Sequence, residues 1–221
     1  MQNPQSEITL ALSKGKLFEP AIKLLQRAGF VRDPRLFNSR RLRFESDTQE
    51  PFRFLLVKNS DVPTYVEYGI ADAGIAGLDV LLESGAEVDA PLNLKIGHCR
   101  IAVAGRPEDA DKGYTLQSQL RVATKYPRLT RDYFAGRGAQ VEIIKLDGSV
   151  ELAALVGLAD RIVDLVETGE TLRQNGLMVH EIIGESTGRL IVNKASHKLK
   201  LAQINELIAR LRKAVHENSA S

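Results

Sequence analysis

The feature that most constrains this chain of 221 residues is a regular alternation of short apolar runs with helical patterns. The runs are rich in Ile, Val and Leu and are bounded by Gly, Asp or Pro, as β-strands are. Strands are predicted at Ile8–Ser13, Phe52–Val57, Ala71–Ala76, Arg100–Ala104, Leu120–Thr124, Val141–Leu146 and Ile162–Val166. Helices are predicted between them, at Lys16–Ala28, Val62–Tyr68, Leu78–Glu83, Arg128–Gly136 and Val150–Leu155. This alternation predicts an α/β protein with mainly parallel sheets.

Two further patterns suggest how the chain divides. The stretch Arg106–Gln119 is charged, contains Pro and Gly, and is predicted to be a variable loop. A strand-like pattern returns at Met178–Asn193, and Lys198–Val215 is predicted to be an amphipathic helix. We therefore expect one lobe from residues 1–102 plus 180–221 and a second lobe from residues 103–179.

Charge and cysteine content narrow the class of protein. Thirty basic residues against 28 acidic ones give a net charge of +2, without the surplus of a general nucleic-acid binder. His98 beside Cys99, the only cysteine, could suggest a metal site, but adjacent strand residues face opposite ways, which favours ordinary packing. The polar N-terminus lacks the apolar core of a signal peptide, and no apolar run is long enough to span a membrane. A cytoplasmic protein without nucleic-acid or membrane partners is expected.

The stretch Lys145–Leu172 carries the strongest chemical signal, because it holds two passages from strand to loop to helix. Asp147-Gly148-Ser149 leads into one helix, and Glu167-Thr168-Gly169-Glu170-Thr171 follows the next strand. Exposed amides at a helix start bind anions, and Gly169 permits a tight turn with threonine hydroxyls beside it. Asp164 and Glu167 offer carboxylates to a sugar diol. A single Thr-Gly turn is common, but two such turns with an acidic pair resemble the phosphoribosyl pyrophosphate (PRPP) motif of type I phosphoribosyltransferases.

The resemblance extends to one specific family over most of the chain. The run Gly157-Leu-Ala-Asp to Asn175-Gly-Leu177 closely resembles the PRPP-binding signature of ATP phosphoribosyltransferases. Other segments resemble further family motifs: Leu10-Ala-Leu-Ser-Lys-Gly-Lys16, Ser39-Arg40-Arg41-Leu42, Ser60–Gly69, Ala71–Asp79 and Leu120-Arg-Val-Ala-Thr-Lys-Tyr126. One departure is Ala154, where many members have proline in the loop.

The resemblance implies a fold, a reaction and partners. The fold would be two periplasmic-binding-protein-like lobes around a central cleft, with ATP on the first lobe and PRPP on the second. The reaction would join PRPP to N1 of ATP in the first step of histidine biosynthesis. The chain resembles the short form, which lacks a histidine-sensing domain and works with a histidyl-tRNA-synthetase-like regulatory subunit. A hetero-octamer with that partner, and a homodimer without it, are expected.

The resemblance also implies site residues. Because N1 of adenine has a lone pair, the main demands are orientation and neutralisation of the departing pyrophosphate. Lys16, Arg40 and Arg41 are the predicted catalytic cations, and arginine suits the task because its fork binds phosphate oxygens in pairs. The predicted substrate-binding residues are Ser13, Lys14, Gly15, Ala76, Gly77, Asp79, Gly148, Ser149, Glu151, Leu152, Ala153, Gly157, Asp164, Glu167, Thr168, Gly169, Glu170 and Thr171. Mg²⁺ is expected mainly on the substrate phosphates, without a dedicated protein site.

Two other functions fit the same sequence patterns. A solute-binding protein would share the lobes without any chemistry, since fold alone does not fix function. An adenylate-sensing regulator would bind AMP or ATP without turnover. The Thr-Gly-x-Thr turn and the missing signal peptide favour the enzyme. Formation of an N1-alkylated adenine from ATP and PRPP would separate the three.

Overall fold

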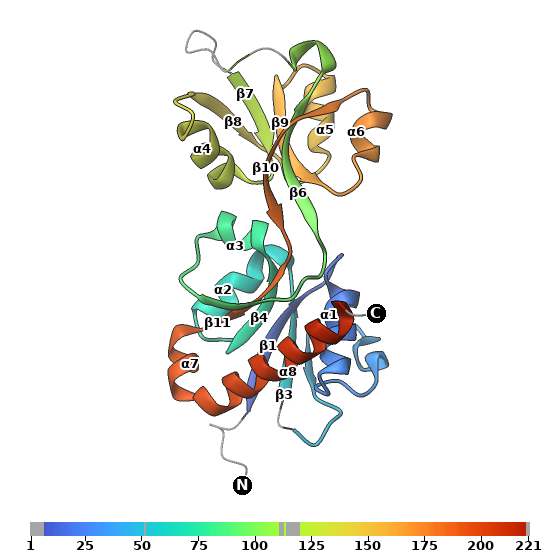
Figure 1. The fold of residues 1–221 in the computed structure, drawn as a ribbon, viewed down its shortest axis with the longest axis vertical. Helices are drawn as coiled ribbons and strands as arrows, with labels where there is room; N and C mark the ends of the chain where they lie inside the picture. Colours follow the sequence, from blue (N-terminus) through green and yellow to red (C-terminus); the bar gives the residue numbers. More distant parts are fainter. Residues whose placement is uncertain (1–6, 51, 111–112, 114–119, 220–221) are drawn as a thin grey trace. The chain divides into compact units, whose positions relative to one another are not determined.

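The computed structural model describes residues 7–50, 52–110, 113 and 120–219, and it divides them into two compact units (Figure 1). Unit 1 comprises Met1–Gly97 and Thr187–Ser221, and unit 2 comprises His98–Ser186. These boundaries differ from the expected ones at 102 and 180. The reason is that strands β6 (Cys99–Gly105) and β10 (Met178–Ser186) pair from Cys99↔Ser186 onward, so both belong wholly to unit 2.

Unit 1 is built on a six-stranded sheet, sheet A, in the order β2-β3-β1-β4-β11-β5. Its strands are β1 (Ile8–Ser13), β2 (Arg43–Glu45), β3 (Phe52–Val57), β4 (Ala73–Gly77), β5 (Asp89–Asn93) and β11 (Gly188–Val192). Its helices are α1 (Phe18–Arg27), α2 (Val62–Glu67), α3 (Leu78–Ser84), α7 (Lys194–Leu199) and α8 (Leu201–Ser219), with short 3₁₀ turns η1 (Pro34–Phe37) and η2 (Asn59–Asp61). Strands β3, β1 and β4 are parallel, whereas β2, β11 and β5 pair antiparallel.

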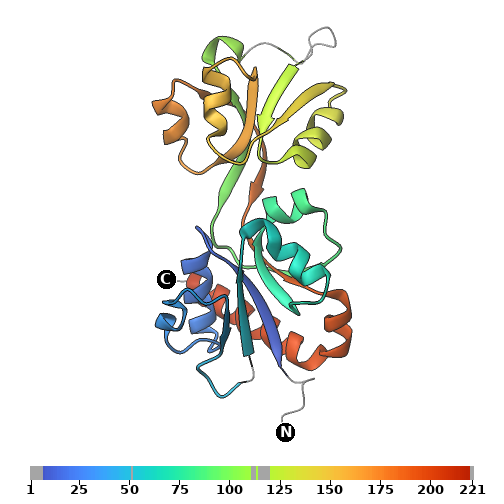
Figure 2. The same ribbon diagram turned by 180° about the vertical axis from the view of Figure 1, so that it is seen from behind.

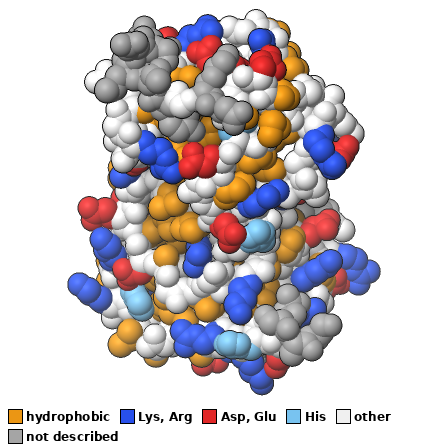
Figure 3. All heavy atoms as spheres, turned by 45° about the horizontal axis from the view of Figure 1, so that its top comes forward, with side chains coloured by type: hydrophobic (Ala, Val, Ile, Leu, Met, Phe, Trp, Pro, Cys, Tyr) orange, Lys and Arg blue, Asp and Glu red, His pale blue; other side chains and the backbone are white. Residues whose placement is uncertain are grey.

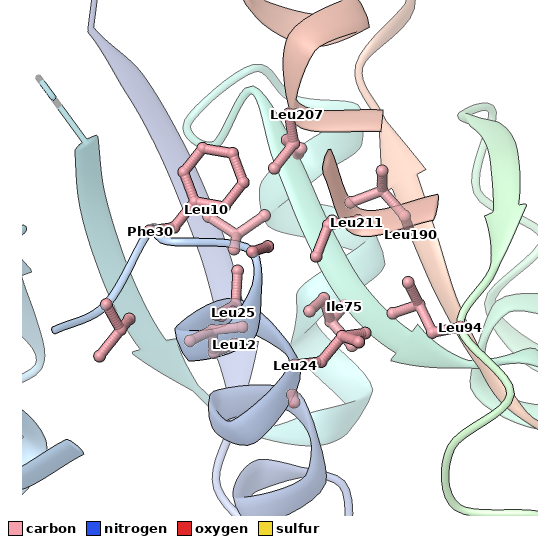
Figure 4. Packing of buried hydrophobic residues seen from close by; sticks show 14 of the residues in the cluster. Leu10, Leu12, Leu24, Leu25, Phe30, Ile75, Leu94, Leu190, Leu207 and Leu211 are labelled. Carbon is pink, nitrogen blue, oxygen red and sulfur yellow. The ribbon is translucent and has the colours of Figure 1, made fainter. Parts of the chain in front are cut away.

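Both faces of sheet A are covered by helices, which explains why its central strands are apolar throughout. Helices α1 and α8 pack on one face, where α8 crosses the sheet in Figure 1, and α2 lies on the opposite face, seen from behind in Figure 2. Figure 4 shows the main core, where Leu10 and Ile75 of the sheet meet Leu24, Leu25, Leu207 and Leu211 of the helices. These leucines and Ile75 are 3% exposed or less.

Unit 2 has a five-stranded sheet, sheet B, in the order β10-β6-β9-β7-β8. Besides β6 and β10, it contains β7 (Leu120–Thr124), β8 (Val141–Lys145) and β9 (Arg161–Val166), with helices α4 (Pro127–Ala135), α5 (Val150–Leu155) and α6 (Glu170–Gln174) and the turn η3 (Pro107–Asp109). Strands β8, β7 and β9 are parallel, while β6 and β10 are antiparallel. Helix α4 packs on one face of the sheet, and α5 and α6 pack on the other.

The α/β class is confirmed, but both sheets are mixed rather than mainly parallel. The two units share one topology, although no internal repeat is visible in the amino-acid sequence. In unit 1, β1 leads through α1 to β3, and β3 leads through α2 to β4 on the other side of β1. In unit 2, β7, α4, β8, α5 and β9 repeat this path. The two units therefore repeat the same arrangement of strands and helices with different amino-acid sequences.

The expected loop Arg106–Gln119 begins with η3 and then largely lies outside the described residues, at 111–112 and 114–119. Its described start is anchored to sheet B. The buried guanidinium of Arg161, 3.4 Å from a carboxylate oxygen of Asp109, also donates to the Asp109 carbonyl. The Arg106 guanidinium donates to the carbonyl of Ala154 at 3.0 Å, near the end of α5. Among the described residues, none of the helices has the length and apolar character that crossing a membrane requires.

Candidate active site

The first candidate anion site is the turn Asp147-Gly148-Ser149, between β8 and α5. Ser149 has φ 48° and ψ 44°, a left-handed conformation that is uncommon outside glycine and tends to occur at functional sites. Gly148 and Ser149 are exposed, and a Cβ at Gly148 would meet no neighbouring atom. The turn that leads into α5 is therefore open around Gly148, and the first N–H groups of a helix have no carbonyl partner one turn earlier.

The second candidate site is the turn Glu167–Thr171, between β9 and α6. Gly169 has a φ of 77°, so the tight turn predicted at this glycine is present. The Thr168 hydroxyl oxygen accepts a hydrogen bond from the backbone N–H of Glu170 at 3.3 Å, which holds the turn closed. The Glu170 carboxylate is held by Arg173 and by the Gln174 amide (3.0 Å). The Glu170 carboxylate thus binds side chains of its own helix, α6, while Thr168, Gly169 and Thr171 shape the turn.

Strand β7 brings the two turns to the same edge of sheet B. It pairs in parallel with β8 on one side and β9 on the other, so all three strands end at one edge. The chain leaves β7 toward α4 on one face and leaves β9 toward α6 on the other. Ligands in α/β sheets bind at such a switch point, beyond the carboxyl ends of the strands. Half-buried Asp164 lies on β9 just before this edge and accepts from the N–H of Leu165 at 2.8 Å.

Three of the predicted residues, on α5 or just after it, do not place a side chain at the turn Asp147–Ser149. Ala153 is 2% exposed and packs in the core of unit 2, because the inner face of α5 must cover sheet B. Leu152 is 55% exposed on the outer face, and Gly157 follows the opposite end of the helix, with a φ of 75°. Glu151 stands in the first turn of α5, where a carboxylate is favoured by the helix dipole.

In unit 1 the predicted loop after β1 lines a hollow of about 570 Å³. Lys14, Gly15 and Lys16 form one wall, and Phe18 and Phe37 are among the residues that form the rest. Ser13 is buried at the strand end, whereas the two lysines are exposed. Gly15 has a φ of 146°, which L-residues rarely adopt, so the loop shape depends on glycine. Both lysines therefore stand at the rim of a concave surface, as anion binding requires.

The predicted basic pair separates. Arg41 lines a second hollow of about 650 Å³ together with Arg35 and Arg43, whereas Arg40 is exposed and lines neither hollow. Arg35 is engaged by Asp33, and the hydrogen bond between them lowers the pKa of the Asp33 carboxyl. Arg41 is therefore the member of the pair that contributes to a concave basic surface.

The remaining predicted residues lie where β4 ends. Ala76 and Gly77 close the strand and are buried, and Asp79 is 4% exposed in the first turn of α3. A buried carboxylate at a helix start is stabilised by the helix dipole. This strand end corresponds to the turn after β9 in unit 2, because β4 pairs in parallel with β1 as β9 does with β7.

Two residues that we did not predict also belong to this region of unit 2. The Arg100 guanidinium, on β6, reaches the backbone carbonyl of Glu167 at 3.5 Å. Arg100 faces the same side of the sheet as Ala102, whose partner on β9 is Asp164. The sequence could have placed Arg100 on the same face as Ala102 and Ala104, because side chains alternate along a strand. That Glu167 is its neighbour follows only from the pairing of β6 with β9. The second residue that we did not predict is Lys125, directly after β7.

The His98–Cys99 pair has ordinary partners. Cys99 is buried and its thiol faces the Ser186 carbonyl at 3.9 Å, while exposed His98 lies 3.4 Å from a carboxylate oxygen of Glu185. Within the described part of the chain, no three His, Cys, Asp or Glu side chains gather in a way that could hold a metal ion.

Comparison with known proteins agrees with this geometry. The model of the ATP phosphoribosyltransferase family matches residues 58–213. ATP phosphoribosyltransferases of Geobacter metallireducens and Bacillus licheniformis are 52% and 51% identical, covering 94% and 93% of this chain and 98% and 94% of their own lengths.

Solved structures agree as well. The ATP phosphoribosyl transferase (HisG:HisZ) complex from Thermotoga maritima contains a chain with a TM-score of 0.82 and 31% identity, covering 95% of this chain and 99% of that one. The VFT2 domain of Bordetella pertussis BvgS shares the fold alone, with a TM-score of 0.56, 15% identity and coverage of 96% and 87%. The expected likeness to periplasmic-binding-protein lobes is thereby confirmed. The chain belongs to the ATP phosphoribosyltransferase family.

Proposed function

We propose that the chain transfers the phosphoribosyl group of PRPP to N1 of the adenine ring of ATP. The products are N1-(5-phosphoribosyl)-ATP and pyrophosphate, and the reaction is the first step of histidine biosynthesis. The observation that carries the proposal is the pair of open turns at one edge of sheet B, with Asp164 on β9 shortly before the second turn. This arrangement suits a ligand with a phosphate at one end and a sugar diol beside it.

The turn Glu167–Thr171 is proposed to bind the 5′-phosphate of PRPP, and Asp164 and Glu167 to accept hydrogen bonds from the ribose hydroxyls. Helix-start amides and threonine hydroxyls donate to phosphate oxygens, while carboxylates accept from a diol. Holding the ribose in this way fixes C1′ for attack. The N1 lone pair then forms the new bond to C1′ as the bond to pyrophosphate breaks and its electron pair leaves with the oxygen.

Unit 1 is proposed to supply the ATP side and the cations for the leaving group. Lys14 and Lys16 line one hollow and Arg41 lines the other. Cations aimed at charge that grows in the transition state accelerate the chemical step, whereas equal binding in both states does not. The roles of Lys16, Arg40 and Arg41 as leaving-group stabilisers remain predictions.

Mg²⁺ is proposed to arrive on the substrate phosphates, where it would neutralise the diphosphate. The residues present fit this role, since Asp164 and Glu167 offer carboxylate oxygens near the proposed ribose site, and Mg²⁺ prefers oxygen ligands and keeps several waters. Asp164 and Glu167 carry the carboxylate oxygens nearest the proposed ribose site.

Surface charge supports a small anionic substrate rather than a nucleic acid. Figure 3 shows basic and acidic side chains interspersed over the face it displays, and the net charge is only +2. A continuous basic stripe, as nucleic-acid binders use, would look different.

The deciding test is a reaction of the purified chain with ATP and PRPP. We expect a new N1-alkylated adenine chromophore and one pyrophosphate per turnover. A solute-binding protein would bind a ligand without product, and an adenylate sensor would bind ATP without consuming PRPP. Either of these results would replace the proposed function.

The phosphate and ribose assignment is tested by calorimetry with PRPP. Thr168→Ala and Asp164→Ala remove a turn hydroxyl and a diol acceptor, and each should weaken PRPP binding about tenfold. Thr64→Ala, at an exposed position on α2 in unit 1, is the control and should bind as the parent does. Unchanged affinity in both site variants would remove the turn from the site.

The partner is proposed to be a histidyl-tRNA-synthetase-like regulatory subunit. Support comes from the Thermotoga maritima relative, whose solved structure is a HisG:HisZ complex and whose whole chain matches this one. We expect the isolated chain to be active and insensitive to histidine, and addition of the partner to confer inhibition. Strong inhibition of the isolated chain at histidine concentrations that leave PRPP binding intact would contradict this. The hetero-octamer, the homodimer and the cytoplasmic location stay predictions.

A further inference from the structure

Lys125 lies between the two candidate turns of unit 2. It follows Thr124, the last residue of β7, and Thr124 pairs with Lys145 at the end of β8 and with Val163 on β9. The turn Asp147–Ser149 therefore begins on one side of Lys125, and the turn Glu167–Thr171 follows β9 on the other. Lys125 stands at the switch point itself, where ligands of such sheets bind.

The pleat of β7 gives the direction of the lysine. Val122 packs on the α4 face and Ala123 on the α5/α6 face. Thr124 returns to the α4 face, where its hydroxyl oxygen lies 3.2 Å from that of Thr130 on α4. Continued for one residue, the alternation directs Lys125 to the α5/α6 face, which carries both turns.

The backbone at Lys125 is fixed by buried neighbours. The Thr124 hydroxyl donates to the carbonyl of Val163 at 2.8 Å and accepts from the N–H of Tyr126 at 2.9 Å. Thr124 is fully buried and Tyr126 is 5% exposed, while Lys125 is exposed between them. A lysine with a clamped backbone and a free side chain loses little further backbone entropy when it binds a ligand.

The carboxylates around the turn Glu167–Thr171 suggest a role for the positive charge of Lys125. The second turn carries Glu167 and Glu170, Asp164 lies on β9 just before it, and Glu170 pairs with Arg173. A phosphate placed beside these carboxylates would be repelled unless cations offset them, and Arg100, whose guanidinium reaches the Glu167 carbonyl, is one such cation. Lys125 makes no ion pair with any described side chain. The corresponding loop of unit 1, after β1, likewise carries lysines, Lys14 and Lys16, at the rim of a hollow.

We propose that Lys125 binds the 5′-phosphate of the phosphoribosyl substrate, as a cation shared between the turns Asp147–Ser149 and Glu167–Thr171. The proposal rests on the proposed function and adds a binding residue to that site. Its ammonium group donates to phosphate oxygens that the turn amides leave unpaired, and it offsets the charge of Asp164 and Glu167. Charge-assisted hydrogen bonds of this kind are about twice as strong as neutral ones.

The test compares Lys125→Met with a matched control, Lys145→Met. Lys145 pairs with Thr124 at the same sheet edge and is also exposed, but strand alternation directs it to the α4 face. Steady-state kinetics on the full chain should show a KM for PRPP raised about tenfold or more in Lys125→Met, with the KM for ATP unchanged. Lys125→Arg should recover part of the loss, and Lys145→Met should match the parent.

Inhibition by substrate fragments identifies the group that Lys125 holds. Ribose 5-phosphate should compete with PRPP about tenfold less well in Lys125→Met, while inhibition by inorganic pyrophosphate stays unchanged. Loss of pyrophosphate inhibition alone would assign Lys125 to the leaving group and overturn the proposal. Equal effects of Lys125→Met and Lys145→Met, or no effect of either, would overturn it as well.

Failure of this proposal is distinguishable from failure of the proposed function. If the chain makes product and Thr168→Ala raises the KM for PRPP while Lys125→Met does not, only the role of Lys125 is wrong. If the parent chain makes no product from ATP and PRPP, the function itself is wrong.

Discussion

The basic side chains of unit 1 occupy three different surroundings, although the sequence grouped them as one set. Lys16 stands at a rim shaped by Gly15, and Arg41 shares a hollow with two other arginines. Arg40 is exposed outside both hollows. The predicted contribution of Arg40 to the reaction is therefore tested by measuring the reaction rate with both substrates present.

Arg40→Ala is expected to lower the single-turnover rate by roughly 10²-fold, by analogy with loss of one electrostatic stabiliser. PRPP affinity should fall less, because the contact strengthens as charge develops on pyrophosphate. Lysine at this position should restore only part of the rate, since it keeps the charge and loses the fork. Rapid-quench measurement at saturating ATP and PRPP avoids masking by slow product release.

The competing result is informative for Arg40. A large loss of substrate affinity with an unchanged chemical rate would make it a uniform binding residue. An unchanged rate and affinity would leave it as a surface arginine and shift the expected role to Arg41.

At the scale of elements, prediction succeeded where apolar patterning was strong. Strands Ile8–Ser13, Phe52–Val57 and Leu120–Thr124 and helix Val150–Leu155 are confirmed to the residue. Strands β2 and β5 were missed, because both are short sheet edges, Arg43–Glu45 with charged ends and Asp89–Asn93 with a central proline. Such edges need little apolar surface, so they leave no periodic pattern to detect.

The predicted terminal helix Lys198–Val215 is two helices, α7 and α8, because the chain breaks at Lys200. Lys200 has φ −119° and ψ 37°, and its ammonium donates to the Glu7 carbonyl (2.8 Å) and to Asp72 (2.9 Å). Asp72 is 6% exposed and also accepts from the N–H of Thr9 and the hydroxyl of Ser196. A buried contact more than a hundred residues away in sequence sets this break, and periodicity has no access to it.

Lys200→Met should lower the free energy of unfolding by about 3 kcal/mol, because it leaves the buried charge of Asp72 without its ion-pair partner. Urea denaturation followed by circular dichroism measures the change. The double variant with Asp72→Asn should regain part of the loss, since it removes the uncompensated charge. Lys198→Met, on the same segment but exposed, serves as the control. Equal stability of Lys200→Met and the control would show that the pair contributes nothing.

The free energy of unfolding should depend on pH through His180, which lies on β10. Burial, and then the charge of Arg161, lower the pKa of His180 below its ordinary 6.5. The unfolded chain therefore binds a proton where the folded chain does not. The stabilisation from neutral His180 is fully present above pH 6.5 and is lost as the pH falls through 6.5 toward the lower folded pKa.

His180→Gln should flatten the decline in unfolding free energy below pH 6.5, as measured by urea titrations at a series of pH values. His216→Gln, at an exposed position on α8, should keep the slope of the parent. Identical slopes for the parent and His180→Gln would mean that another group governs this range.

At the scale of the molecule, unit 2 is an insertion within unit 1. The chain passes from one unit to the other twice, at residues 97–98 and at residues 186–187. These two connections lie side by side, because Gly188 forms backbone hydrogen bonds with Leu94 and Ile96, and strand pairing resumes at Cys99↔Ser186. Each unit has its own apolar core, with no cluster shared between them among the described residues. The candidate anion-binding turns of unit 2 and the basic hollows of unit 1 are thus built on separately stabilised scaffolds.

Residues 98–186 are therefore expected to fold when expressed alone and to show dispersed NMR spectra. Unit 1 should also fold when Gly97 is joined to Thr187 through an Asn-Gly turn, because the neighbouring residues Ile96 and Gly188 are already joined by a backbone hydrogen bond. Cooperative thermal unfolding of both fragments is the expected outcome. A fragment that remains unfolded under native conditions would mean that its stability depends on the other unit.

Helix α8 has a consequence for the order of events during synthesis. Its buried side chains, Ile204, Leu207 and Leu211, complete the core that begins with Leu10 and Leu12 of the first strand. On the ribosome, β1 must wait for α8 before its core is complete, whereas the inserted unit has all its residues before α8 is made. The nascent chain therefore carries a complete unit 2 while unit 1 is incomplete, and the open apolar face of unit 1 is exposed to chaperones until α8 has been synthesised.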